Sequence, residues 1–330
     1  MQTNYEHIRA TIESSPQEQQ YAIAKSLSCL HVYNIVYANQ SLKYRAIELE
    51  FELPLYTSEG EKTEFTYGGI IDGIVEQDNK LHVIDHKLLG QVKPWTFDVY
   101  RVSEQTRSYL LAGWQTGYDF DSFIYDVIVK PGISPRRNQN IPQTWQKELD
   151  SGVYHGIPFP YWQGEVRETP LMYFVRCVAT LLGDTAKHFI RRPIRVAQHD
   201  LRRHNQLLID SHLMTEKMRS DRNLWHPNSN SCSAFNSPCD FLGICSGSST
   251  VADFPKKEGK GGCAMSPSRL QCMQSCLRKY AFKYIERLET PPSGSDALLI
   301  GSVFHSALEV SLQDKIVDPI TQTQFQTGRT

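Results

Sequence analysis

Two nearly continuous apolar runs joined by a turn constrain the fold of this chain more than any other feature. They lie in the segment FTYGGIIDGIVEQDNKLHVIDHKLLG, where the residues from Gln77 to Lys80 form the turn. Apolar runs of this length on either side of turn-forming residues predict a β-hairpin. We therefore expect this hairpin at the centre of a sheet.

The segments around the hairpin predict both helices and strands. The segment RAIELEFELPL alternates apolar and charged residues and predicts a half-buried strand with Ile47, Leu49, Phe51, Leu53 and Leu55 on one face. A second strand is expected at FIYDVIVK. Apolar spacing predicts helices at 17–38, with Cys29 in the core, and at 97–117, 170–220 (interrupted at Pro193), 266–288 and 297–312. Residues 131–165 are expected to be a loop. The expected fold class is α/β, with a mixed central β-sheet flanked by helices.

Composition sets limits on the kind of protein. A chain of 330 residues that is 40% hydrophobic can bury a substantial core, as one large or two modest domains. It has no signal peptide and no apolar run of about 20 residues, so we expect a cytoplasmic protein. A net charge of -1 argues against broad nucleic-acid binding, so any DNA contact is local. Candidates, each of which has an ordinary solvated charge as the alternative, are Lys130, Arg136, Arg137, Arg191, Arg192, Arg195, Arg202 and Arg203.

Two carboxylates and a lysine in the hairpin point to metal-dependent chemistry. Asp72 and Asp85 lie within apolar strands, where an ionised group is costly unless a cation binds it. Asp85 and Lys87 share one face of their strand because side chains alternate. The alternative is a buried Asp–Lys ion pair. The complete set, however, fits phosphodiester cleavage, in which carboxylates hold Mg²⁺ or Mn²⁺ and an ammonium positions water or stabilises developing charge.

The segments GGIID, ending at Asp72, and VIDHK, ending at Lys87, resemble the core motif of the PD-(D/E)XK nuclease superfamily. Gln105 and Tyr109 resemble the Gln-x-x-x-Tyr signature of its RecB-like exonuclease branch, and their spacing places both on one helical face. The resemblance implies a restriction-endonuclease-like core in which these two residues support the active site. Glu48, on the strand before the hairpin, falls where relatives often carry a glutamate. The simpler interpretation is that Glu48 belongs to the solvated face of this strand.

Two further motifs of this branch occur late in the chain, where relatives carry them early. They are CLRKY, starting at Cys276, and GSVFH, ending at His305. A circular permutation of one nuclease domain and a nuclease followed by a truncated second copy both fit this order, and we favour permutation. The resemblance then implies a nuclease core at 1–245, a linker at 246–262 and a permuted N-terminal part at 263–330. It also implies that His305 completes the metal shell, with Glu309 on the same side of its helix.

The late cysteines resemble the ligands of a 4Fe-4S cluster in the same branch. Their spacing does not fit a zinc knuckle. The resemblance implies Cys232, Cys239, Cys245 and Cys276 as ligands, with Cys272 as a substitute for Cys276 and zinc as the rival metal. Cys177 and Cys263 are expected to be incidental.

These features predict a Mg²⁺- or Mn²⁺-dependent deoxyribonuclease acting on single-stranded or end-containing DNA, in DNA repair, recombination or phage DNA processing. The alternative is an inactive nuclease-fold module for nucleic-acid binding or assembly, with a structural metal site; a structural zinc protein is a third reading. The sequence identifies no helicase or recombination partner, no polarity of digestion and no oligomeric state.

Overall fold

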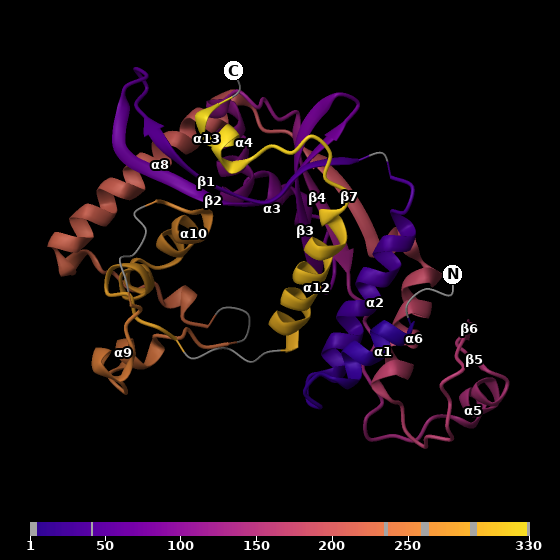
Figure 1. The fold of residues 1–330 in the computed structure, drawn as a ribbon. Coiled ribbons are helices and arrows are strands. Elements are labelled where there is room, and N and C mark those ends of the chain that lie inside the picture. Colours follow the sequence, from indigo (N-terminus) through magenta and orange to yellow (C-terminus); the bar gives the residue numbers. More distant parts are fainter. Residues whose placement is uncertain (1–4, 41, 234–236, 259–263, 291–295, 329–330) are drawn as a thin grey trace.

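The computed structural model describes residues 5–40, 42–233, 237–258, 264–290 and 296–328. Its centre is a mixed five-stranded sheet in the order β1-β2-β3-β4-β7 (Figure 1). Only the β3–β4 pair is parallel among the pairs of this sheet, and the others are antiparallel. The strands are β1 (Lys43–Tyr56), β2 (Lys62–Gln77), β3 (Lys80–Leu89), β4 (Ser122–Val129) and β7 (Phe189–Ile194). The mixed α/β fold with a central sheet is therefore as predicted.

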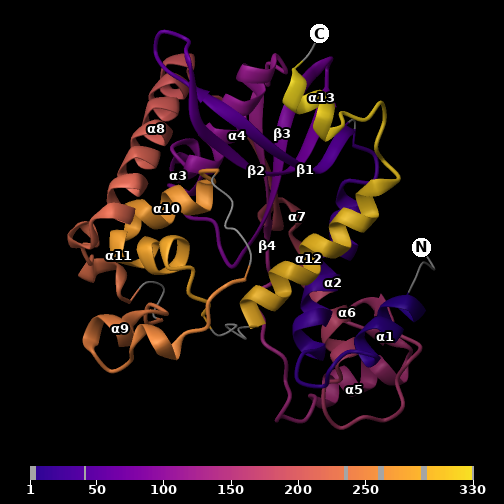
Figure 2. The same ribbon diagram turned by 60° about the vertical axis from the view of Figure 1, so that its left-hand side comes forward.

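Helices cover both faces of the sheet (Figure 2). One face packs against α1 (Tyr5–Glu13), α2 (Gln20–Val36), α6 (Pro170–Gly183) and α12 (Asp296–Gln313). The other face packs against α4 (Glu104–Thr116), α8 (Gln198–Ser220), α10 (Pro267–Ser275), α11 (Leu277–Tyr280) and α13 (Gln322–Thr327). The remaining helices are α3 (Thr96–Arg101), α5 (Gln143–Asp150), α7 (Thr185–His188), α9 (Leu242–Ser246) and a π-helical turn at Ala281–Ile285. Within the described ranges, no helix is long and apolar enough to cross a membrane.

The predicted hairpin forms as expected. Gln77 pairs with Lys80, and Asp78 and Asn79 between them adopt positive φ angles of 52° and 60°, as a two-residue hairpin turn requires. Leu49, Phe51, Leu53 and Leu55 of β1 are buried as predicted. Ile47 is half-buried and packs with the hydrophobic cluster on the other face of the sheet, so the prediction that it shares a face with Leu49 is wrong; Glu48, between the two, has a φ of 48° that disturbs the alternation.

Three expectations need correction. The helix predicted at 97–117 is two helices, because the Ser103 side chain accepts the Thr106 N–H and caps a new helix, α4. The region 131–165 is not only a loop, since it holds α5 and a small hairpin of β5 (Val153–Tyr154) and β6 (Ile157–Pro158). The interruption near Pro193 is an edge strand, β7, where proline is tolerated.

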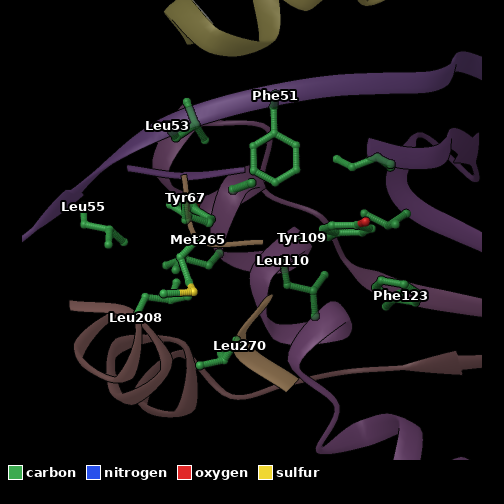
Figure 3. Close-up of a cluster of buried hydrophobic side chains, with 14 of the residues drawn as sticks. Phe51, Leu53, Leu55, Tyr67, Tyr109, Leu110, Phe123, Leu208, Met265 and Leu270 are labelled. Atoms are coloured by element: carbon green, nitrogen blue, oxygen red, sulfur yellow. The ribbon is translucent and has the colours of Figure 1, made fainter. Parts of the chain in front are cut away.

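The C-terminal segment is built into both sides of the sheet. Met265 exchanges backbone hydrogen bonds with β2, through Thr66 and Gly68, and its side chain packs with Leu270 in the core shown in Figure 3. Past α12, the Val317 N–H donates to the Tyr44 carbonyl of β1 at 2.8 Å. Phe304 of α12 is fully buried against α2 and the sheet. Part of the predicted linker is also ordered, with a 3₁₀ turn at Val251–Asp253.

Candidate active site

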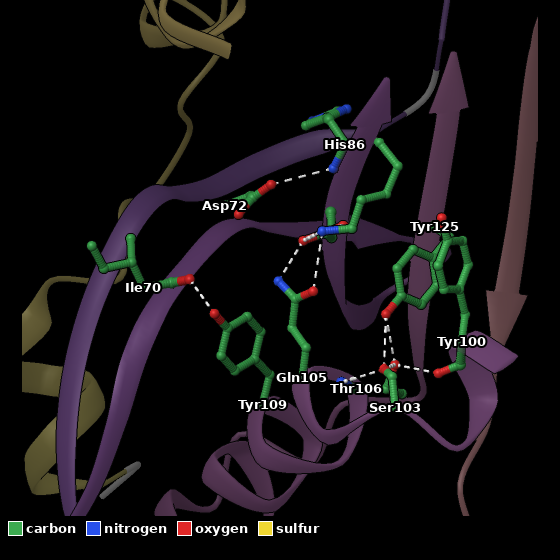
Figure 4. Close-up of polar contacts among 11 residues, drawn as sticks. Ile70, Asp72, His86, Tyr100, Ser103, Gln105, Thr106, Tyr109 and Tyr125 are labelled. Atoms are coloured by element: carbon green, nitrogen blue, oxygen red, sulfur yellow. Dashed lines mark hydrogen bonds and ion pairs between the residues drawn. The ribbon is translucent and has the colours of Figure 1, made fainter. Parts of the chain in front are cut away.

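The candidate site lies where β2 and β3 separate. Their pairing runs from the turn to Gly73 and Ile84. Beyond this point the Asp72 side chain lies between the strands, and its Oδ2 accepts the backbone N–H of His86 at 3.3 Å (Figure 4). Asp72 is therefore held at the opening of the fork by the strand that carries Asp85 and Lys87.

Asp85, Lys87 and Gln105 form a closed hydrogen-bonded group. The Lys87 Nζ lies 2.8 Å from Asp85 Oδ2 and donates to Gln105 Oε1 at 3.1 Å. The Gln105 amide donates to Asp85 Oδ1 at 2.7 Å. Asp85 is fully buried, and burial raises its pKa to about 6 although the Lys87 ammonium opposes the shift. Burial would lower the pKa of Lys87, but the Asp85 carboxylate outweighs this effect and leaves it raised.

Tyr109 supports the other strand of the fork. Its hydroxyl donates to the Ile70 carbonyl at 2.6 Å (Figure 4). Gly69 makes this approach possible, because a Cβ atom there would lie 3.0 Å from Tyr109 Cε1. Gln105 therefore contacts β3 and Tyr109 contacts β2, so α4 fixes both arms of the fork.

His305, on the C-terminal helix α12, lies near this site. Burial lowers its pKa, the neighbouring His86 ring lowers it further, and the Asp85 carboxylate opposes both. A lowered pKa keeps the imidazole neutral at pH 7, which is the form that binds metals. The structure thus brings His305 into electrostatic range of Asp85 and Lys87.

Glu48 lies closer to the site than the sequence indicated. The register that pairs Ile47 with Gly73 and Leu49 with Ile71 places Glu48 opposite Asp72. Partial burial and the neighbouring carboxylates of Asp72 and Glu309 raise the pKa of Glu48. A positive φ at a residue other than glycine is strained, and such strain concentrates at functional sites. Glu309, expected one turn beyond His305, lies close enough to act on Glu48.

A pocket of about 780 Å³ opens beside Lys87. One wall belongs to β2 and α4, and another to α10, so the pocket joins parts of the chain that are far apart in the sequence. Its lining includes Ile70, Lys87, Val99, Tyr100, Val102, Gln105, Tyr109, Ser266, Ser268 and Gln271. Ile70, Val99 and Val102 at its rim are 48%, 53% and 55% exposed, which gives the entrance an apolar edge.

A buried polar network on the opposite face of β3 was missed from the sequence. Asp126 of β4 accepts hydrogen bonds from Tyr33 at 2.7 Å and Arg191 at 2.6 Å, and its Oδ2 lies 3.2 Å from His86 Nδ1. Burial opposes ionisation, but His86 and Arg191 lower the pKa of Asp126 to about 2. The signal in the sequence is an aspartate inside the apolar run FIYDVIVK. The network anchors β3 directly behind Asp85 and Lys87.

The donors at the fork suit a hard divalent cation, since Asp72 and Asp85 offer oxygens and His305 a neutral imidazole. In this conformation Asp72 Oδ2 accepts the His86 N–H, and Asp85 is paired with Lys87 and accepts a hydrogen bond from Gln105. Across the residues that the structure describes, no set of three or more His, Cys, Asp or Glu side chains is arranged to hold a metal ion.

The late cysteines lie in one neighbourhood. The Cys239 N–H donates to the Cys232 carbonyl at 2.8 Å, and the thiols of Cys239 and Cys276 both act on the pKa of Cys245, which burial raises. These cysteines and Cys272 are free, and they form no ready ligand set among the described residues. The predicted iron–sulfur site is thus not supported by the structure. Cys29 and Cys177 are buried in the core, and Cys263 lies outside the described residues.

Helix α12, which carries His305, lies in the part of the chain that matches a family model. Residues 264–325 match the sequence model of the PD-(D/E)XK nuclease superfamily. No curated protein matches the chain. A solved structure described as the crystal structure of SSO0001 is similar over 38% of this chain and 53% of its own length, with 18% sequence identity and a TM-score of 0.23. The chain thus spans about half the length of that protein.

Proposed function

We propose that this protein is a metal-dependent deoxyribonuclease of the RecB-like type, with its active site at the fork between β2 and β3. The observation that carries the proposal is the contact of Lys87 with both Asp85 and Gln105 next to Asp72. A buried ion pair alone would need neither the glutamine that bridges both partners nor a second carboxylate beside it.

Asp72, Asp85 and His305 would hold Mg²⁺ or Mn²⁺. When bound, such an ion would supply Lewis-acid chemistry at the scissile phosphate and would help to activate water. The Lys87 ammonium stays protonated, because its pKa is raised, and it can donate hydrogen bonds to the attacking water or to the phosphate oxygens. Gln105 orients Lys87 and Asp85, and Tyr109 holds β2 in place.

The proposal includes a circular permutation, in which residues 263–330 supply the opening of the nuclease domain. The family match at 264–325 supports it. The match covers the C-terminal segment, whereas the carboxylate and lysine motif lies much earlier in the chain, in β2 and β3. The packing of Met265 on β2 and of α12 on the opposite face also supports it. A truncated second copy would not be expected to complete the first copy's site.

Single-stranded DNA, or an end that frays into single strands, is the proposed substrate. The pocket beside Lys87 has the apolar rim of Ile70, Val99 and Val102, which suits unpaired bases better than the charged exterior of a duplex. Repair, recombination and phage DNA processing are settings that need such an enzyme.

The experiment that tests this function is degradation of end-labelled single-stranded DNA with Mg²⁺ or Mn²⁺. We expect activity in the parent protein and a loss of at least about 100-fold in Lys87→Ala, because one electrostatic contact to the transition state contributes about 3 kcal/mol. Lys93→Ala is the matched control, since Lys93 is exposed and leaves the Asp85 group intact. A folded parent that binds DNA but cuts none would favour the second candidate, a non-catalytic binding module. The observation that favours this second candidate is that no set of three or more His, Cys, Asp or Glu side chains among the described residues is arranged to hold a metal ion.

We also propose that Cys232, Cys239, Cys245 and Cys276 bind a 4Fe-4S cluster, with a structural role. The proposal rests on the resemblance of the cysteine spacing to such ligand sets and on the nearness of three of these thiols, although the described residues form no ready ligand set. Anaerobically purified protein should be brown and contain about four irons per chain, as a 4Fe-4S cluster requires. Cys276→Ser should lose the colour, whereas Cys177→Ser should keep it. Colourless protein with stoichiometric zinc would contradict the iron assignment.

A further inference from the structure

A second pocket, of about 510 Å³, lies between the segment that follows β4 and helix α6. Three arginines line it, Arg136, Arg137 and Arg176, together with the amides of Asn138 and Gln139. The chain as a whole carries a net charge of -1, so this concentration of positive charge is a local feature. No part of the cleavage site described above uses it.

Aromatic rings hold the three guanidinium groups in place. Arg136 lies 5.3 Å and Arg176 lies 5.6 Å from the centroid of Trp145 of α5. Arg137 lies 4.6 Å from the ring of Tyr21 of α2. Stacking of this kind fixes the plane of a guanidinium and leaves its N–H groups pointing outward, where they can bind the oxygens of an anion.

Only one of the three arginines is neutralised. The buried Glu168 accepts hydrogen bonds from Arg176 at 2.6 and 2.8 Å, and also accepts the backbone N–H of Arg136 at 2.7 Å. No carboxylate among the described residues lies within 4.0 Å of the Arg136 or Arg137 side chain. The Nε of Arg136 is buried without a hydrogen-bond partner in the same set of residues. Two guanidinium groups are therefore oriented and left without an anion.

A short series of contacts links the pocket to helix α12. β3 and β4 are parallel, so Lys87 and the segment after β4 lie toward the same edge of the sheet. The Lys25 ammonium of α2 donates to the Ile133 carbonyl at the pocket, and the adjacent Ser26 donates to the Ile300 carbonyl of α12. Helix α12 carries His305, and Figure 2 shows it between the sheet and the α1–α5–α6 group.

We propose that Arg136 and Arg137 bind backbone phosphates of the DNA strand at a distance from the cleaved bond. This inference rests on the proposed nuclease function. It adds a second region of the protein that contacts the DNA, besides the cleavage site. Guanidinium groups suit phosphate because their paired N–H groups match two of its oxygens. Arg136 and Arg137 rest on rings from different helices, so they are separate donors that fit successive phosphates of a strand better than one free phosphate.

The salt dependence of binding tests this assignment. Binding of a labelled single-stranded oligonucleotide is measured by fluorescence anisotropy in EDTA, at a series of salt concentrations, so that no cleavage occurs. Each phosphate contact to a single strand contributes about 0.7 to the slope of log affinity against log salt. We expect Arg136→Ala with Arg137→Ala to reduce the slope by roughly 1.4. Arg219→Ala, which removes an exposed arginine of α8 that pairs with Glu216, should leave it unchanged.

Lysine variants separate charge from geometry. Arg136→Lys with Arg137→Lys should retain most of the slope but bind more weakly than the parent, because lysine lacks the planar fork. Inorganic phosphate should compete no better than chloride at equal ionic strength, and stronger competition would mean that the pocket takes a free anion instead.

An unchanged slope in a folded double alanine variant would overturn the inference. Mg²⁺-dependent cleavage is scored separately. If the parent never cuts DNA but the slope still falls in the double variant, the nuclease proposal fails and the phosphate contacts stand. If the parent cuts DNA and the slope does not change, only the phosphate contacts fail.

Discussion

Asp126 shows how one buried residue can matter to a site that it does not enter. It is fully buried on β4 and receives hydrogen bonds from α2 and β7, while His86 of β3 lies beside it. His86 in turn lies between Asp85 and Lys87 in the chain, and its backbone N–H holds Asp72. An ionised Asp126 therefore anchors the strand on which the candidate site is built.

The stability contributed by Asp126 should depend on pH. Its pKa is lowered to about 2 in the folded protein, below the value of about 3.9 for an unfolded chain. A lowered pKa stabilises the fold fully above pH ~4, and this contribution is lost as the pH falls toward 2. We expect the gap in unfolding free energy between the parent and Asp126→Asn to shrink by about 2 kcal/mol over that range. Urea unfolding of both proteins at several pH values measures the gap, and a constant gap would contradict the assignment.

At the scale of elements, the β2–β3 turn sets the register of the fork. Both central residues, Asp78 and Asn79, have positive φ, a conformation that β-branched residues tolerate poorly. Asn79→Val should therefore cost about 1–3 kcal/mol of stability, whereas Asn79→Gly should change it by less. Thermal or urea unfolding provides the measurement. The Asn79 side chain is exposed, so its loss alone should matter little. If Asn79→Val and Asn79→Gly reduced the stability equally, the positive φ of the turn would not be the cause.

The elements that the sequence predicted correctly are those with local signals. The hairpin is marked by its turn and its apolar strands, β4 by a continuous apolar run, and α12 by its periodicity. β7 was missed because FIRRPI is short, charged and contains proline, and its strand character comes from pairing with β4. The two-residue strands of β5 and β6 likewise depend on contacts that no local pattern records.

The candidate site also contains some features that the sequence predicts and others that it does not. Asp85 and Lys87 share a face because strand geometry requires it, and Gln105 contacts both. The Asp126 network could not be predicted, since it needs α2, β3, β4 and β7 to meet. The nearness of Glu48 to Asp72 depends on a backbone conformation at Glu48 that its sequence context does not signal.

At the scale of the whole molecule, the C-terminal segment is part of both cores. Met265 and Leu270 pack in one, and Phe304, Leu308 and Leu312 in the other, all of them buried. Burying one such side chain contributes about 1.5–3 kcal/mol. Residues 1–258 without this segment would leave matching apolar surface exposed on both faces of the sheet.

Splitting the chain tests this dependence. We expect residues 1–258 to be insoluble alone but to copurify with residues 259–330 when the two pieces are expressed together. Leu308→Asp in the smaller piece should abolish copurification, because it places a charge in a fully buried position. Val310→Asp is the matched control, since Val310 is 73% exposed on the same helix. A soluble, monodisperse 1–258 piece would contradict the prediction.

The late position of α12 also gives the protein an order of assembly during synthesis. A ribosome makes Asp72, Asp85 and Lys87 long before it makes His305, and His305 can join the fork only after α12 emerges. On the proposed function, a nascent chain would carry carboxylates and a lysine but no complete metal site. The enzyme would become able to cut DNA only once nearly the whole of this sequence has been made.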